Sequence, residues 1–105
     1  MREQTRLVHC ADSIKYYITL LTTGTRQHPD VQLGASPRAS RMLMQAAKGR
    51  ALLHGRDFVR PDDVQALARP VLSHRLSLKP ESRLKRSTPE LIIQSVLERT
   101  PVPEK

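Results

Sequence analysis

Aromatic side chains are scarce in this chain of 105 residues: Tyr16, Tyr17 and Phe58 make up 3% of it, and tryptophan is absent. Sheets are usually rich in aromatic and β-branched residues. The apolar 38% of the chain must therefore build an aliphatic core, which suits packed helices. A single cysteine, Cys10, excludes an internal disulfide and is typical of a reducing compartment. The composition favours a small all-α domain with one modest core.

Long apolar runs are also missing. No stretch approaches the roughly 20 residues that are needed to span a bilayer, and the polar residues 1–6 are followed by no apolar segment of a signal peptide. We therefore expect a cytoplasmic protein with no membrane partner. The net charge of +8 comes from 13 Arg and 5 Lys against 10 acids. This charge favours an anionic partner, which could be nucleic acid, a nucleotide phosphate or an acidic protein surface.

The usual signatures of catalysis are absent from the 105 residues. There is no G-x-x-x-x-G-K-[ST] phosphate loop, no G-x-G-x-x-G and no G-x-S-x-G nucleophile elbow. The adjacent Asp62 and Asp63 are typical of helix capping rather than of an acid–base pair. No zinc-ligand spacing is found among the four histidines, which are His9, His28, His54 and His74. We predict that this chain alone is inactive as an enzyme and binds no metal.

Four segments combine apolar residues at helical spacing with a start signal. The clearest begins at Ser36, a good N-cap, with Pro37 at the first helical position, and ends at Gly55. Another begins at Pro61 and carries two acids in its first turn. The predicted helices are residues 12–26, 36–54, 61–77 and 88–99.

Two of these helices contain weak points. Gly24 and the threonines beside it lower helix propensity, so the first helix should fray near residues 23–26. Pro70 removes a backbone hydrogen bond and should kink the third helix. We expect a loose tail at residues 101–105, and residues 3–10 could add a short extended segment. Four short amphipathic helices that share one core indicate a single domain, residues 1–105, folded as a small four-helix bundle.

Arg38 stands in an unusual place, the first turn of the second helix. The helix dipole is positive there, so an exposed cation costs roughly 0.3–1 kcal/mol. An arriving anion would reverse the balance, because free N–H groups and the guanidinium would converge on it. The residues alone leave two readings open: an anion site, or a well-capped helix whose Arg38 extends into solvent, and the second is the simpler.

The segment around Arg38 resembles a known family. Thr25-Arg-x-His-Pro-Asp-Val-x-Leu-Gly-Ala-Ser-Pro-Arg-Ala-Ser40 is similar to the sensor-2 region of the MoxR-type AAA+ ATPases. Two further blocks agree in order and spacing, Gly55-Arg-Asp-Phe-Val-x-Pro-Asp-Asp-Val64 and Val71-Leu-x-His-Arg-Leu76. The resemblance runs from about residue 12 to residue 103, which is most of the chain.

The resemblance implies a fold of the AAA+ lid type, a helical domain that packs over an ATP-binding core. Arg38 would be the sensor-2 arginine that reaches the γ-phosphate, with Ser36 and Pro37 beside the nucleotide and Arg26 and His28 as further candidates to line the cleft. The family uses ATP and Mg²⁺, forms rings with subunits of its own kind, and includes chaperone-like ATPases that mature complexes or insert cofactors. A protein with a von Willebrand factor A domain is a frequent partner.

The catalytic motifs of that family have no counterpart in these residues. Walker A, Walker B, sensor 1 and the arginine finger are expected on sequence outside the 105 residues, in a core domain of the same chain. The alternative is a free-standing basic helical adaptor that binds nucleic acid or protein. Such a binder should gather its cations on one face, whereas a lid should leave apolar surface bare; the cations concerned are Arg41, Lys48, Arg50 and Arg69.

The basic loop of residues 79–87 has no neighbouring aromatics, which makes nucleic acid an unfavoured partner. In the segment between the second and third helices we expect Phe58 to pack beneath the turn. Arg56 and Asp57 are expected to serve a local capping role rather than a contact between subunits.

Overall fold

In the computed structural model of the protein, residues 8–103 are described. Their regular elements, in chain order, are α2 (Asp12–Gln27), β1 (Val31–Leu33), α3 (Pro37–Leu53), α4 (Pro61–Leu72), the 3-10 turn η1 (Ser73–Arg75), β2 (Ser77–Leu78), α5 (Pro80–Leu84) and α6 (Pro89–Arg99). The fold is mostly helical, as predicted, with four helices of substantial length and a minimal sheet.

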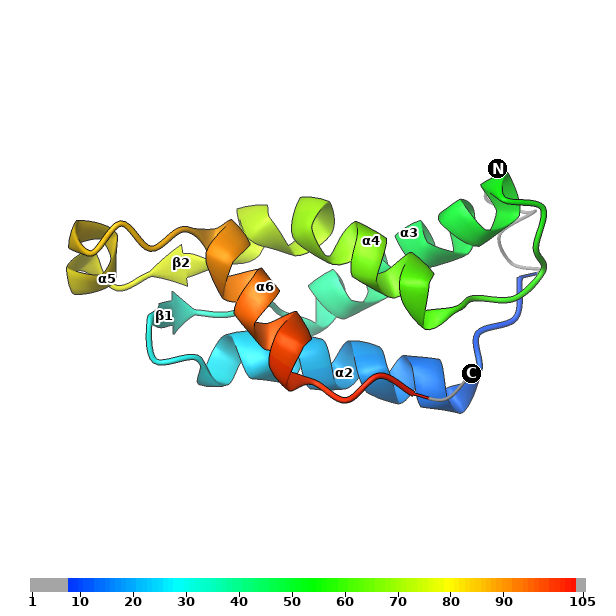
Figure 1. Ribbon diagram of the computed structural model, residues 1–105, viewed down its shortest axis with the longest axis horizontal. Helices are drawn as coiled ribbons and strands as arrows, with labels where there is room; N and C mark the ends of the chain where they lie inside the picture. The colour runs from blue at the N-terminus through cyan, green and yellow to red at the C-terminus, as the bar shows by residue number, and fades with distance from the viewer. Residues whose placement is uncertain (1–7, 104–105) are drawn as a thin grey trace.

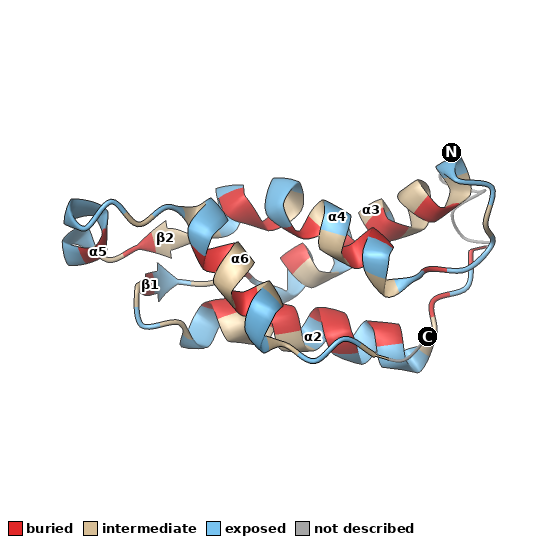
Figure 2. Ribbon diagram, in the orientation of Figure 1, coloured by how far each residue is buried: buried red, intermediate tan, exposed pale blue. Residues whose placement is uncertain are grey.

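The bundle is elongated, measuring 44 × 27 × 20 Å. Helices α2, α3 and α4 run along its length, and α6 crosses α2 and α4, while the two strands and α5 form one end (Figure 1). Buried residues face the space between the helices (Figure 2). The core is aliphatic apart from one tyrosine, and its largest fully buried apolar side chains are Tyr17, Ile14, Leu21, Leu43, Leu72, Ile93 and Val64.

Both ends of α3 follow the local signals in the sequence. Ser36 is the N-cap and Pro37 the first helical residue. At the other end Gly55 has a φ of 73°, its N–H donates to the Leu52 carbonyl at 3.0 Å, and the Arg56 N–H donates to the Ala51 carbonyl at 2.9 Å. These two bonds form a Schellman motif, which requires a left-handed residue at the position of Gly55.

The expected fraying of the first helix is wrong, because α2 continues to Gln27. Thr22 and Thr25 donate their hydroxyl protons to the carbonyls of Thr19 at 3.0 Å and Thr22 at 2.6 Å, so the threonines bond back onto their own helix. A Cβ on Gly24 would lie 2.8 Å from Cγ1 of Val96. The glycine therefore permits the close approach of α6 to α2.

The third helix was predicted to reach residue 77, and this is wrong: α4 ends at Leu72. Pro70 lies inside the last turn, where its missing N–H removes one of the final helical bonds. The chain then passes through η1 into β2, which pairs antiparallel with β1 through Val31–Leu78 and Leu33–Ser77. Strands this short show no alternating pattern in the sequence, so these two were not predicted.

Helix α5 was also missed, within a segment expected to be a loop. This short helix begins with Pro80 at its first position and ends at Leu84. The Ser82 hydroxyl donates to Oδ1 of Asp30 at 2.7 Å, and the Lys79 N–H donates to the Asp30 carbonyl at 3.0 Å. Asp30 thus ties α5 to the segment before β1, a long-range contact that local propensity does not reveal.

Of the short extended segment suggested for residues 3–10, His9 forms an isolated parallel bridge with Phe58 and Val8 lies in a bend, while residues 3–7 lie outside the described residues. His9 donates its N–H to the Asp57 carbonyl at 2.7 Å and accepts from the Val59 N–H at 2.9 Å. Val8 and Cys10 are buried on either side, and burial raises the pKa of the Cys10 thiol. Of the expected loose tail, residues 101–103 have no helix or strand, and residues 104–105 are outside the described range.

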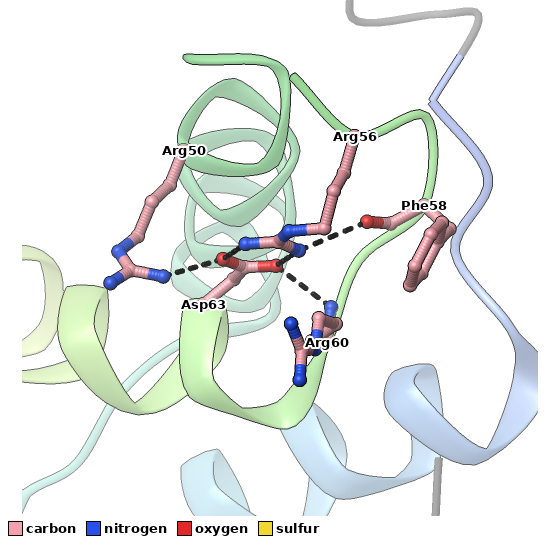
Figure 3. Close-up of polar contacts among 5 residues, drawn as sticks. All are labelled: Arg50, Arg56, Phe58, Arg60 and Asp63. Atoms are coloured by element: carbon pink, nitrogen blue, oxygen red, sulfur yellow. Dashed lines mark hydrogen bonds and ion pairs between the residues drawn. The ribbon is translucent and has the colours of Figure 1, made fainter. Parts of the chain in front are cut away.

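The turn between α3 and α4 is built on the buried carboxylate of Asp63, whose side chain is 0% exposed (Figure 3). Arg56 binds both of its oxygens, with Nη2–Oδ1 at 2.8 Å and Nη1–Oδ2 at 2.7 Å. Arg50 on α3 adds a contact of 2.6 Å from Nη1 to Oδ1. The N–H of Arg60 donates to Oδ2 at 2.8 Å, so the predicted capping role of Asp63 is confirmed, with two arginine partners that were not predicted.

The local role expected for Arg56 is also confirmed, since its Nη1 donates to the Phe58 carbonyl at 3.3 Å. Phe58 was expected to pack beneath the turn, and this is wrong: 46% of it is exposed. The Arg56 guanidinium instead lies over the Phe58 ring, 5.9 Å from the centroid. The ring therefore covers one face of the arginine that binds Asp63.

Burial alone would raise the pKa of Asp63, but the hydrogen bonds from Arg56, from the Arg60 N–H and from Arg50 outweigh it. Together they lower the pKa of Asp63 from 3.8 to about 2. Above pH 3.8 the carboxylate is ionised in both the folded and unfolded states, and its contribution to stability is complete. As the pH falls from 3.8 toward 2, the unfolded state takes up the proton first, so this contribution is lost.

We therefore predict that Asp63→Asn destabilises the chain by about 2–3 kcal/mol at pH 7, because two arginines lose their counter-charge. The difference in unfolding free energy between wild type and this variant should shrink between pH 4 and pH 2, measured by urea denaturation. The control is Asp62→Asn, which changes an exposed acid in the same turn. The unfolding free energy of this variant should depend on pH as that of the wild type does. A difference that stays constant down to pH 2 would contradict the assignment.

Two glycines of the α3 region should respond to alanine in opposite directions. Gly55→Ala should destabilise the fold by about 1–2 kcal/mol, because its φ of 73° is strained for an L-residue. Gly49 lies inside α3, where a Cβ would meet nothing within 4 Å. Gly49→Ala should therefore stabilise by about 0.5–1 kcal/mol through helix propensity. Thermal unfolding followed by circular dichroism measures both, and shifts of the same sign would be inconsistent with this picture.

Candidate functional site

The start of α3 presents Arg38 to solvent. The residue lies in the first helical turn, is exposed, and makes no hydrogen bond or ion pair with any residue of the described range 8–103. Ser36 accepts from the Ala39 N–H through its carbonyl at 2.9 Å and more weakly through Oγ at 3.4 Å. Pro37 has no N–H, so the amide of Arg38 is the first helical donor that remains open.

The electrostatics of this helix start differ from those of the other described helices. Helices α2, α4, α5 and α6 each carry an acid in the first turn, which matches the positive end of the dipole. The first turn of α3 carries no acid and has Arg38 instead. Dipole and guanidinium therefore add to a positive potential at one exposed point, which is the arrangement suited to an anion from outside.

The loop before Arg38 is pressed against the last turns of α2. A Cβ on Gly34 would lie 2.6 Å from Cα and 2.7 Å from N of Arg26, so only glycine fits there. The Ala35 N–H donates to Oγ1 of Thr25 at 3.1 Å, and the Ser40 hydroxyl donates to Oγ1 of Thr22 at 3.0 Å. This anchoring role of Thr22 and Thr25 was not predicted. The signal was the T-x-x-T spacing of residues 22 and 25, which puts both hydroxyls on one face of α2.

Arg26 and His28 were the further candidates to line the nucleotide cleft, and the structure places Arg26 beside the Gly34 loop. Arg26 is exposed in the last turn of α2 and its backbone touches Gly34, so it lies beside the loop that leads to Arg38. His28 accepts the Asp30 N–H at Nδ1, at 3.1 Å. It also lines a cavity of about 380 Å³ between the ends of α2 and α6, together with Val96 and Arg99.

The surface around Arg38 is partly apolar. Leu33, which precedes the Gly34 loop, is 68% exposed, and Met42, one turn after Arg38, is 40% exposed. Of the cations that a nucleic-acid binder should gather, Arg50 is paired with Asp63, and Nη2 of Arg69 donates to the amide oxygen of Gln94. Two of those four cations are thus engaged within the fold itself.

Residues 8–103 contain no cluster of three or more His, Cys, Asp or Glu that could hold a metal ion. None of the described helices is long and apolar enough to cross a membrane. The guanidinium of Arg38 and the open helix end are groups suited to binding an anion.

Comparison with known proteins identifies the fold. The model of the AAA lid domain family matches residues 23–96. The chain is 46% identical over 103 residues to the uncharacterized protein YeaC of Bacillus subtilis, covering 98% of this chain and 32% of YeaC. It is 43% identical over 75 residues to protein MoxR of Methylorubrum extorquens, and 42% identical over 74 residues to chaperone MoxR1 of Mycobacterium tuberculosis. Each of these two matches covers 70% of this chain. The matched part is 22% of protein MoxR and 20% of chaperone MoxR1.

A solved structure gives the same result. The crystal structure of a presumed ATPase from Cytophaga hutchinsonii superposes with a TM-score of 0.93 at 28% identity, covering 98% of this chain and 34% of that protein. The chain thus spans between a fifth and about a third of the length of these relatives. The family match includes the Gly34 loop, the start of α3 and the Asp63 turn. The chain belongs to the AAA lid domain family, in the form found in MoxR-type proteins.

Proposed function

We propose that this chain is the lid of a MoxR-type AAA+ ATPase and that Arg38 is its sensor-2 residue, which contacts the γ-phosphate of ATP held by the core domain. One observation carries the proposal: Arg38 lies exposed and without a partner among the described residues, at a helix start that has no acid. Membership in the AAA lid domain family supports it.

The chemistry of the α3 start fits one phosphate and no more. The guanidinium offers a planar fork of donors, and the helix end adds an N–H and a positive dipole. No acid lies in the first turn of α3, so the Mg²⁺ that accompanies ATP would be held by the core domain. The chain supplies one wall of the nucleotide site, and Ser36 and Pro37 shape that wall by setting where the helix begins.

The role of Arg38 in this proposal is to stabilise charge. Negative charge spreads over the γ-phosphoryl oxygens during phosphoryl transfer, and a fixed arginine lowers the energy of that state. Leu33 and Met42 would cover the nucleotide site on either side and exclude water when lid and core meet. Arg26, beside the Gly34 loop, is a further candidate for contact with the nucleotide, and His28 is a more distant one.

For the whole protein we propose a chaperone-like ATPase that matures complexes or inserts cofactors, works in the cytoplasm and forms rings with further subunits. The name of the relative chaperone MoxR1 supports the chaperone role. A protein with a von Willebrand factor A domain is the proposed partner, on the basis of the family resemblance.

Arg38→Ala in the full-length ATPase should lower ATP turnover by roughly 10²-fold, the usual effect of removing one donor that stabilises the transition state. The fold should survive, since Arg38 is exposed, and stability should stay equal or rise by about 0.3–1 kcal/mol because an unfavourable cation leaves the helix start. Turnover by a coupled assay and stability by thermal unfolding are measured on the same preparation.

The matched control is Arg83→Ala, which removes the same charge from exposed α5 and should leave turnover unchanged. Wild-type turnover in Arg38→Ala would overturn the proposed function. An equal loss in Arg83→Ala would show that net charge, and not the position of Arg38, matters.

The 105-residue chain by itself should show no ATP hydrolysis and only millimolar or weaker affinity for ATP, because one arginine and one helix end make an open site without a phosphate loop. Titration calorimetry with ATP at low salt measures the affinity. Binding in the micromolar range by this chain alone would contradict the division of the site between lid and core.

A further inference from the structure

Two buried threonines of α2 hold the segment that carries Arg38. Thr22 and Thr25 are both 0% exposed, one helical turn apart. A buried hydroxyl destabilises a fold unless it is hydrogen-bonded, and valine would fill the same volume without that requirement. Their presence in the core therefore indicates a role that depends on the hydroxyl groups.

Each hydroxyl uses its proton on its own helix and its lone pair on α3 or the loop before it. Thr25 donates to the Thr22 carbonyl at 2.6 Å and accepts the Ala35 N–H at 3.1 Å. Thr22 donates to the Thr19 carbonyl at 3.0 Å and accepts the Ser40 hydroxyl at 3.0 Å. Because the donor directions are fixed by α2, the two acceptor sites are fixed as well.

The two anchored positions lie on either side of Arg38. Ala35 is three residues before it and Ser40 two residues after it. Ala35 and Ala39 are fully buried, and Gly34 sits in contact with the Arg26 backbone. The backbone of Arg38 is therefore held by polar bonds on both sides, while its side chain remains in solvent.

We propose that Thr22 and Thr25 are positioning residues for Arg38, which set the place and direction from which it reaches a phosphate. This inference rests on the proposed function of Arg38. A shift of about 1 Å in a group that binds a transition state can cost on the order of 10²-fold in rate, so an anchor for the backbone of Arg38 bears directly on turnover.

The decisive variant is Thr25→Val in the full-length ATPase, which keeps the volume and removes the bond to Ala35. We expect kcat to fall about tenfold, with little change in KM for ATP, and Thr25→Ser to restore most of it. Ser40→Ala removes the bond to Thr22 without leaving a buried N–H unpaired, and should give a smaller loss in a protein that remains folded. Thr19→Val is the control, because its exposed hydroxyl bonds to the Lys15 carbonyl of its own helix and, among the described residues, to nothing on α3 or the loop before it.

A double-mutant cycle separates positioning from general destabilisation. If Thr25 acts through Arg38, then Thr25→Val lowers kcat in the wild-type background and adds nothing in the Arg38→Ala background. A loss of kcat of equal size in both backgrounds, or serine and valine variants of equal activity, would overturn the positioning role and leave the role of Arg38 intact. Wild-type turnover in Arg38→Ala would instead overturn the proposed function, and this inference with it.

Hydrogen exchange on the 105-residue chain gives a readout independent of ATP. Thr25→Val should speed exchange of the Ala35 amide by about tenfold or more, as expected when a buried N–H loses its acceptor. Thr19→Val should leave that amide unchanged. An Ala35 amide that stays protected in Thr25→Val would contradict the anchoring itself.

Discussion

The buried carboxylate of Asp63 is the interaction on which the rest of this lid depends. Removing an ionised carboxylate from water costs several kcal/mol unless it is fully bonded. Asp63 meets that condition with Arg50 from α3, Arg56 from the turn and the backbone N–H of Arg60 at the start of α4. One group thus fixes a helix end, a turn and a helix start relative to each other, and α3 and α4 make the most extensive contact in the described fold.

A second polar anchor acts at the other end of α3. The threonines of α2 bond to Ala35 and Ser40, and Ser40 lies about three turns of helix before Arg50. Besides Leu43, the buried residues of α3 are the small Ala39, Ala47 and Ala51. Small side chains allow neighbouring helices to approach closely, but they bury little area and do little to fix the orientation of the helix. The polar contacts near both ends of α3 fix its orientation, and its exposed first turn carries Arg38.

Local signals in the sequence predicted where α3, α4 and α6 begin and that Arg38 lies in the first turn of α3. Caps and stops at Ser36, Pro37 and Gly55 depend on neighbours in the chain, and α3 begins and ends where they predict. The errors lie where distant residues decide. Thr22 and Thr25 looked like weak helix formers because their partners are ten and more residues away. Asp63 looked like a simple capping acid, because only the folded turn brings Arg50 and Arg56 to it.

The position of Arg38 makes sense as a small cost set against a large gain. A cation at an exposed helix N-terminus costs roughly 0.3–1 kcal/mol. In the proposed role the gain is larger, because one donor that stabilises transition-state charge contributes about 2.7–4 kcal/mol in other enzymes. Under the proposed role, the same comparison accounts for the hydrogen bonds on either side of Arg38. The bonds at Ala35 and Ser40 fix the backbone on both sides of Arg38, so its side chain starts from one place at the positive end of the dipole, where an incoming anion would offset the unfavourable charge.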